Sequence, residues 1–373
     1  MMKKPSKAAR GNYVSEWFGH RVFPNVVAGK KSLKEQQAES CPFLTAAIGE
    51  VRTCIKSSAA RGVCTINTAT SGTRMDWLVC PYRALDPSLL ESAVRRLFGF
   101  RESQAVYIIP AIRLEAEKIR EEIGQRLRSG DRVFIYFDEK LGGELSIPAT
   151  AKSPEFSFDV TIIEIELSDG RPHVGRFGVI EIQTMDFHGS YRKAVANLKD
   201  ALRLHPKDFA TSLQTNQNWL SEDIEGPNIA NVFKRTFYQM MFKFQLGQNP
   251  RCAGCVLAVP LSVWESWQRH LGQPELRSEP DGTFSLFPSG GARPPIVPAW
   301  IYVFDISSMS RTSPSPLVIS KIIATDATSI SHYALQVAPA AALENIASAT
   351  GMLTLLARRI SRLWPELGTT LTV

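Results

Sequence analysis

The sequence predicts an α/β fold in which amphipathic helices pack on a β-sheet. Three segments rich in β-branched and aromatic residues, 132–137, 156–165 and 177–183, are predicted to be strands. Other segments carry apolar residues at helical spacing, which predicts helices between the strands. The 373 residues, 44% hydrophobic and 21% charged, suffice for one large globular domain with a smaller one beside it.

The first quarter of the chain predicts a compact N-terminal module. Short segments separated by Gly, Ser and Thr contain four of the six cysteines, Cys41, Cys54, Cys64 and Cys80. We therefore divide the chain into an N-terminal region, residues 1–100, and a larger domain, residues 101–373.

The other elements follow from local signals. Helices are expected at 87–98 and 114–127, and a third should begin after Ser190, a plausible N-cap. A turn at 168–171 should join the strands on either side of it as a hairpin. Further along the chain we expect a helix at 228–244, strands at 255–260 and 299–306, and a helix at 340–363 that Pro365 ends.

The composition is that of an ordinary soluble protein, and its basic charge balance is only weak evidence for an anionic partner, because many basic proteins bind no nucleic acid. The formal net charge is +7, which would raise the local concentration of a polyanion such as DNA. The basic start of the chain lacks the apolar stretch of a signal peptide, and no segment approaches the roughly 18 apolar residues that span a bilayer. We expect a cytoplasmic protein without membrane contact, whose cysteines are thiols or metal ligands rather than disulfides.

Polar side chains on two neighbouring strands suggest a catalytic site. Side chains alternate along a strand, so Glu181 and Gln183 share one face. Asp159 lies across the predicted hairpin, and pairing of the strands would bring it to the same place. Glu144 precedes them, next to Gly142 and Gly143, which would let the backbone approach a ligand closely.

This residue pattern suits phosphodiester hydrolysis. The reaction needs a nucleophilic water, stabilisation of negative charge on the phosphoryl oxygens and help for the leaving oxygen. Mg²⁺ held by carboxylate oxygens supplies all three, with Asp159 and Glu181 as the central ligands. Gln183 is uncharged, so it can position a water or donate to a phosphate oxygen but cannot act as an acid. From the residues alone, the solvated polar face of an ordinary sheet is the more common explanation of such a pattern.

Long runs of the sequence resemble the NotI family of restriction endonucleases, which belongs to the PD-(D/E)XK superfamily. The resemblance covers most of residues 12–270, and beyond them only patches such as AWIYVF at 299–304. The runs include NYVSEWFGHRVFP at 12–24, DWLVCPYRALDP at 76–87, EKLGGELS at 139–146, SPEFSFD at 153–159, GVIEIQTMDFHGSY at 178–191 and EGPNIANVFKRTFYQM at 225–240.

The resemblance implies a specific fold and activity. The fold would be a PD-(D/E)XK core, a mixed central sheet flanked by helices, with a small Cys₄ metal-binding module. The family's active-site positions fall on Glu144, Asp159, Glu181 and Gln183, and glutamine in place of the motif lysine is what the family shows. The protein would be a homodimer that cuts both strands of duplex DNA at a G/C-only palindrome such as GCGGCCGC or CGGCCG, leaving 5′-phosphate and 3′-hydroxyl ends. A companion DNA methyltransferase would complete the restriction-modification system.

The four N-terminal cysteines match the family's structural metal site, an iron centre. Four thiolates in a tetrahedral array suit either iron or zinc. Spacing alone is less specific, because these cysteines contain no Cys-x-x-Cys pair, and buried free thiols would explain them equally well. Cys252 and Cys255 do form such a pair, but no second pair accompanies it, and we interpret them as core or loop thiols.

Several other residues have two interpretations. His188 could contact phosphate or assist the attacking water, or it could have an orienting or packing role. Lys234, Arg235 and Lys243 could line the DNA, or they could form a solvated basic helix face above buried aromatic residues. Two alternative functions also stay open: a DNA-binding protein that cuts nothing, and a nuclease without sequence preference.

Overall fold

The chain is an α/β protein built on one large sheet. The computed structural model describes residues 11–70, 73–101, 103–288, 293–307, 313–344 and 349–366. Within these residues a nine-stranded mixed sheet has the order β14-β15-β17-β16-β13-β10-β9-β6-β5. Its strands are β5 (Val106–Pro110), β6 (Arg132–Phe137), β9 (Val160–Ser168), β10 (Arg171–Ile182), β13 (Cys252–Pro260), β14 (Arg277–Ser278), β15 (Phe284–Ser285), β16 (Ala299–Ile306) and β17 (Leu317–Thr325).

The predicted hairpin is present at the centre of this sheet. β9 and β10 pair antiparallel, and Asp169 and Gly170 make the turn between them with φ of 53° and 74°. Two consecutive residues with positive φ are typical of the tight turns that match strand twist. β13 runs parallel to both β10 and β16. The strands predicted at 255–260 and 299–306 are therefore confirmed.

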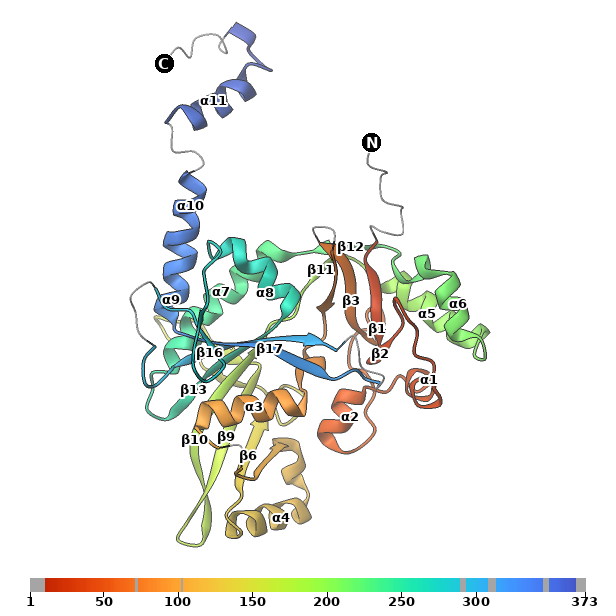
Figure 1. Ribbon diagram of the computed structural model, residues 1–373. Helices are drawn as coiled ribbons and strands as arrows, with labels where there is room; N and C mark the ends of the chain where they lie inside the picture. Colours follow the sequence, from red (N-terminus) through yellow and green to blue (C-terminus); the bar gives the residue numbers. More distant parts are fainter. Residues whose placement is uncertain are drawn as a thin grey trace.

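Helices cover both faces of the sheet (Figure 1). α3 (Pro87–Phe98) packs with Ile180 and Val256 on one face, whereas α7 (Ile229–Leu246) packs with Val179 and Leu257 on the other. These strand residues alternate between the two faces, as strand geometry requires. α8 (Leu261–Trp267) lies on the α7 side, and α4 (Glu117–Arg128) packs against β6 and β9 near the sheet edge. A large mixed sheet flanked by helices is thus confirmed.

A second, four-stranded sheet is formed by the N-terminal part of the chain. Its order is β2-β1-β3-β4, with β1 (Tyr13–Trp17), β2 (His20–Arg21), β3 (Val63–Thr70) and β4 (Thr73–Leu78). It shares a core with α5 (Arg192–Leu204) and α6 (Phe209–Thr215), while Cys41, Cys64 and Cys80 belong to the core under α3. α1 (Lys30–Gln37) and α2 (Pro42–Ile48) complete this region. The first hundred residues therefore pack closely against later ones, and a separate module with a boundary at residue 100 stays a prediction.

Some element boundaries differ from those predicted. The segment 114–127 begins with a 3-10 turn at Ala111–Glu115 before α4. Tyr191, not Ser190, is the N-cap of α5, although the Ser190 hydroxyl accepts a hydrogen bond from the backbone of Arg192 at 3.2 Å.

The C-terminal helices also differ from the sequence expectation. The expected helix at 340–363 corresponds to a series that starts earlier: α9 (Ala327–His332), a π turn (Tyr333–Val337), α10 (Ala338–Glu344) and α11 (Ala349–Ile360). Residues 345–348 of that helix lie outside the described residues. α10 and α11 lead away from the body of the molecule (Figure 1). None of the helices in the described ranges combines the length and the apolar character that a bilayer span needs.

A buried ion pair joins the N-terminal sheet to the rest of the protein. Glu16 and Arg83 have exposed side-chain fractions of 0% and 1%, and Arg83 Nε donates to Glu16 Oε2 at 3.1 Å. Arg83 also donates to the carbonyl of Ser315, and Thr65 donates to Glu16 at 2.6 Å. Both charges are therefore satisfied inside the protein.

We expect Glu16→Ala to lower the free energy of unfolding by about 3–5 kcal/mol, because the Arg83 charge would stay buried without its partner. Urea unfolding measures this change. Glu50→Ala is the control, since the Glu50 side chain is 75% exposed and pairs with Arg52 at the surface. That control should change stability by less than about 0.5 kcal/mol. A loss below about 1 kcal/mol in Glu16→Ala would contradict the importance of this pair.

Candidate active site

Asp159 and Glu181 lie together at one end of the β9–β10 hairpin. Asp159 separates β8 (Phe156–Phe158) from β9, so the strand predicted at 156–165 is interrupted at this residue. Its carboxylate accepts a hydrogen bond from the backbone of Ile182 at 2.9 Å, and the Glu181 carboxylate accepts one from the backbone of Asp159 at 3.3 Å. These reciprocal hydrogen bonds hold the two acidic side chains against each other's strand.

Gln183 lies beside this pair. Its Oε1 accepts a hydrogen bond from Thr236 of α7, and its Nε2 donates to the carbonyl of Thr184. A cavity of about 20 Å³ lies between these groups, roughly the space of one water molecule or small ion. Its lining consists of Asp159, Glu181, Ile182, Gln183, Thr236, Gln239, Met240 and Leu257. The structure therefore brings three of the four predicted site residues together.

Lys243 is a site residue whose role the sequence did not reveal. Its ammonium group contacts Glu181 Oε2 at 2.5 Å, and its side chain is 3% exposed. The sequence grouped it with Lys234 and Arg235 as a DNA-lining or solvated basic face. Those two residues are exposed, and Arg235 pairs with Asp186 at 3.1 Å, whereas Lys243 points into the protein. One sequence signal could have revealed this role. Lys243 lies at helical spacing from Thr236 and Met240, which places its charge on the buried face of α7.

Burial controls the electrostatics of the two carboxyl groups. It raises the pKa of Glu181 to about 8, and the charge of neighbouring Asp159 adds to the increase while Lys243 opposes it. Burial also raises the pKa of Asp159, again against the influence of Lys243. Two carboxylates in close contact resist ionising together in a site of low dielectric constant. A divalent cation between them would remove this repulsion, and its binding would release a proton.

Glu144 lies near the pair without direct contact. It is exposed, directly before β7 (Leu145–Ile147), and its charge contributes to the raised pKa of Asp159 after burial. Gly142 has a φ of 132°, and an added Cβ there would lie 2.6 Å from the side chain of Ala111. The close approach that we predicted for a ligand at Gly142 is therefore an approach to Ala111. At Gly143 an added Cβ would meet nothing within 4 Å.

Asp138 is a further acidic residue that the sequence analysis did not select. It follows β6, is 7% exposed, and accepts a hydrogen bond from the backbone of Lys140 at 3.0 Å. Burial raises its pKa to about 6, and charges on Glu139, Asp159 and Glu144 add to this effect. Asp138 thus belongs to the same group of acidic residues as Asp159 and Glu144. The sequence alone could not show this, because it depends on the pairing of β6 with β9.

The ligand chemistry of the pair fits Mg²⁺. In the described ranges no three His, Cys, Asp or Glu side chains are arranged so that they could hold a metal ion. Mg²⁺, however, is usually bound through one or two carboxylates, with waters and substrate phosphates completing its coordination. Asp159 and Glu181 supply two hard oxygen ligands beside a cavity of suitable size.

No family model matches this chain, and no curated protein matches it.

The four N-terminal cysteines share one neighbourhood. Cys41, Cys64 and Cys80 are buried, Cys54 is half-buried, and all are free thiols. Burial raises the pKa of Cys41 to about 11, with additional effects from Cys80 and Cys54. A hydrogen bond with Cys64 lowers the pKa of Cys80 to about 6. The four cysteines belong to one core cluster, but their sulfurs do not adopt the geometry of a metal site in the described structure.

The remaining predicted residues do not line the small cavity beside the carboxylate pair. Cys252 and Cys255 are buried in the core next to α7, and the Cys255 thiol donates to the backbone carbonyl of Lys243 at 2.7 Å. This location matches their interpretation as core thiols. His188 is exposed on β11 (Phe187–Gly189), which pairs with β12 (Ile224–Pro227), and it does not line the small cavity.

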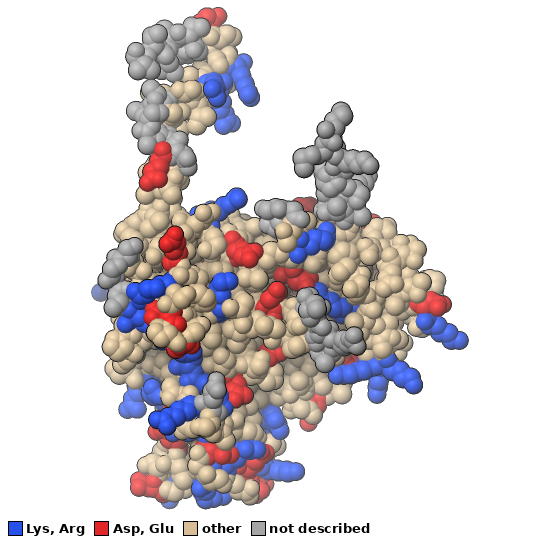
Figure 2. Space-filling model, viewed as in Figure 1, with Lys and Arg blue, Asp and Glu red and all other residues tan. Residues whose placement is uncertain are grey.

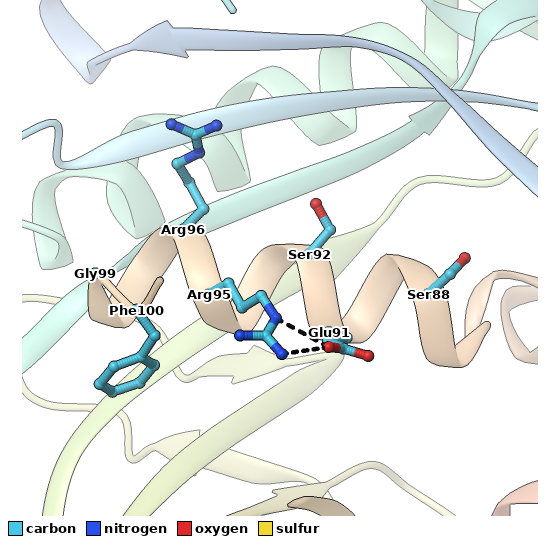
Figure 3. A pocket seen from close by; sticks show the side chains of 7 residues that line it. All are labelled: Ser88, Glu91, Ser92, Arg95, Arg96, Gly99 and Phe100. Carbon is cyan, nitrogen blue, oxygen red and sulfur yellow. Dashed lines mark hydrogen bonds and ion pairs between the residues drawn. The ribbon is translucent and has the colours of Figure 1, made fainter. Parts of the chain in front are cut away.

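A larger hollow of about 630 Å³ lies along α3 (Figure 3), on the face of the sheet opposite to α7 and the small cavity. Its two arginines already have partners. Arg95 pairs with Glu91 at 2.6 Å, and Arg96 pairs with Asp281 at 3.0 Å while stacking on Trp300. Both arginines of this hollow are thus paired with acidic residues of the protein itself, and we propose no ligand for the hollow.

Proposed function

We propose that this chain is a Mg²⁺-dependent endonuclease that hydrolyses phosphodiester bonds in duplex DNA. The observation that carries the proposal is the contact between Asp159 and Glu181. Glu181 is buried, Asp159 lies against it on the adjacent strand, and the two charges would repel each other when both are ionised; a bound divalent cation would offset this repulsion. Their position at one end of a central hairpin, with Gln183 beside them, is the arrangement expected for a PD-(D/E)XK site.

Each residue has a defined part in the proposed reaction. Asp159 and Glu181 would hold Mg²⁺, and the backbone hydrogen bonds at Ile182 and Asp159 fix their orientation. When bound, Mg²⁺ lowers the pKa of coordinated water and stabilises negative charge on the phosphoryl oxygens. Gln183 is held in place by Thr236 and can orient a water or donate to a phosphoryl oxygen. Glu144 would supply a further carboxylate, as the resemblance implies.

We further propose the specific activity that the resemblance implies, a type II restriction endonuclease acting as a homodimer on a G/C-only palindrome. A two-fold protein presents one site to each strand of a self-complementary sequence. A companion methyltransferase would protect the genome, and both would act in the cytoplasm. Basic and acidic side chains are interspersed on the face in Figure 2, so net charge alone does not indicate where DNA would lie.

Digestion of a plasmid that carries one GCGGCCGC site tests this proposal. With purified protein and Mg²⁺, we expect discrete linear product, and EDTA should prevent its formation. A smear would indicate a nuclease without sequence preference. Intact plasmid, together with a DNA mobility shift, would indicate a binding protein and would overturn the proposed cleavage. Sequencing the product ends identifies the target and the cut position.

A further inference from the structure

One face of α7 contacts the candidate active site through two polar side chains. Thr236 donates to Gln183, and Lys243 contacts Glu181, with Met240 between them on the same face and lining the cavity. The α7 residues on this face are buried. The helix therefore fixes two of the predicted site residues from the face of the sheet that it covers.

The position of Lys243 is unusual for a lysine. Lysine is rarely buried completely, because removing an ammonium group from water costs several kcal/mol unless a partner compensates. Its Nζ lies 5.6 Å from the centre of the Phe158 ring, next to Asp159 in sequence, and Glu181 is its ion-pair partner. A methionine or leucine would fill such a position without this cost. The cation is thus directed at the Glu181 carboxyl group.

The neutral side chain of Gln183 leaves the site without the positive charge of the motif lysine. In the Asp, Glu-x-Lys pattern a lysine supplies positive charge along the strand, but Gln183 is neutral. Both ends of its amide are also held by protein groups, Thr236 and the Thr184 carbonyl. The charge beside Glu181 comes instead from Lys243.

We propose that Lys243 is a positioning residue that replaces the missing strand lysine, holding Glu181 toward Asp159 from α7. One lone pair of Glu181 Oε2 is used by Lys243 and one of Oε1 by the Asp159 backbone. A carboxylate has about four lone-pair positions, so coordination sites for a cation remain. This inference rests on the proposed nuclease function and adds the source of positive charge to that site.

Replacement and relocation of the charge test the inference. Lys243→Met keeps the side-chain volume and removes the charge, and we expect it to reduce the plasmid cleavage rate about 10- to 100-fold. In Lys243→Met combined with Gln183→Lys, the charge returns to the strand, and we expect cleavage to recover to within about tenfold of the wild-type rate. Melting curves establish that each variant is folded. Lys118→Met, which removes an exposed lysine from α4, is the control for loss of a positive charge.

Each outcome has a distinct meaning. A folded Lys243→Met protein that cleaves at the wild-type rate would overturn the role of Lys243 while leaving the nuclease proposal intact. Failure of the double variant to recover, when Gln183→Lys alone keeps the wild-type cleavage rate, would show that Lys243 acts only in packing. Gln183→Lys alone should not accelerate cleavage, because the charge is already present; acceleration of tenfold or more would contradict the inference, even if Lys243→Met does not fold. An inactive wild-type protein would overturn the nuclease proposal itself, and this role with it.

Discussion

Asp159→Asn is expected to reduce DNA cleavage by about a thousandfold, equivalent to about 4 kcal/mol in activation free energy. Asparagine has the same shape and can still accept the hydrogen bond from Ile182, but it lacks the charge that binds Mg²⁺. The protein should therefore fold and still bind DNA. Initial cleavage rates on the plasmid measure the loss, and a mobility shift in Ca²⁺ measures retained DNA binding.

Asp169→Asn provides the matched control for this substitution. Asp169 lies at the other end of the same hairpin, in the turn between β9 and β10, and asparagine tolerates its positive φ. Its cleavage rate should equal that of the unchanged protein. An Asp159→Asn rate within tenfold of wild type would count against Asp159 as a ligand.

The second large effect is expected at the four N-terminal cysteines. We propose that Cys41, Cys54, Cys64 and Cys80 hold one structural iron or zinc ion per chain. Thiolates bind these metals, and four protein ligands leave no open position for chemistry. Apparent binding free energies of structural zinc are about 10 kcal/mol or more, so removal of the metal should unfold the N-terminal region. Elemental analysis and melting curves of Cys41→Ser should show metal-poor protein of lower melting temperature.

The raised pKa of Cys41 predicts how metal binding at the four cysteines depends on pH. Burial raises the pKa of Cys41 to about 11, so its free thiol is protonated at neutral pH and metal binding must displace that proton. Metal retention should therefore weaken as the pH falls. Cys252→Ser is the control, because Cys252 lies in the core near α7 and is not one of the four proposed ligands. The metal content of this variant should equal that of the unchanged protein. Metal-free protein that melts at the same temperature as untreated protein would disprove the structural role.

Local sequence signals predicted the central strands and helices well. Residues 132–137 are rich in β-branched and aromatic side chains, and they form β6. The turn at 168–171 contains Asp169 and Gly170, whose preference for positive φ produces the hairpin. The helix predicted at 228–244 corresponds to α7. These elements could be found because their patterns depend only on neighbouring residues.

Features set by tertiary packing were not predictable in this way. The interruption of 156–165 at Asp159 arises because that side chain bonds to the backbone of Ile182, on another strand. The alternation of Glu181 and Gln183 placed both on the correct face, but nothing local shows that Lys243 reaches Glu181 from α7. Asp138 likewise joins the acidic neighbourhood only through the pairing of β6 with β9.

Titration with Mn²⁺, followed by electron paramagnetic resonance of the free ion, tests most directly whether Asp159 and Glu181 hold a divalent cation. We predict binding by the unchanged protein that strengthens from pH 7 to pH 9, because a pKa of about 8 at Glu181 means that fewer protons compete at the higher pH. Asp159→Asn should weaken this binding at least about tenfold. Equal Mn²⁺ affinity in both proteins, at both pH values, would contradict the metal site on which the proposed chemistry depends.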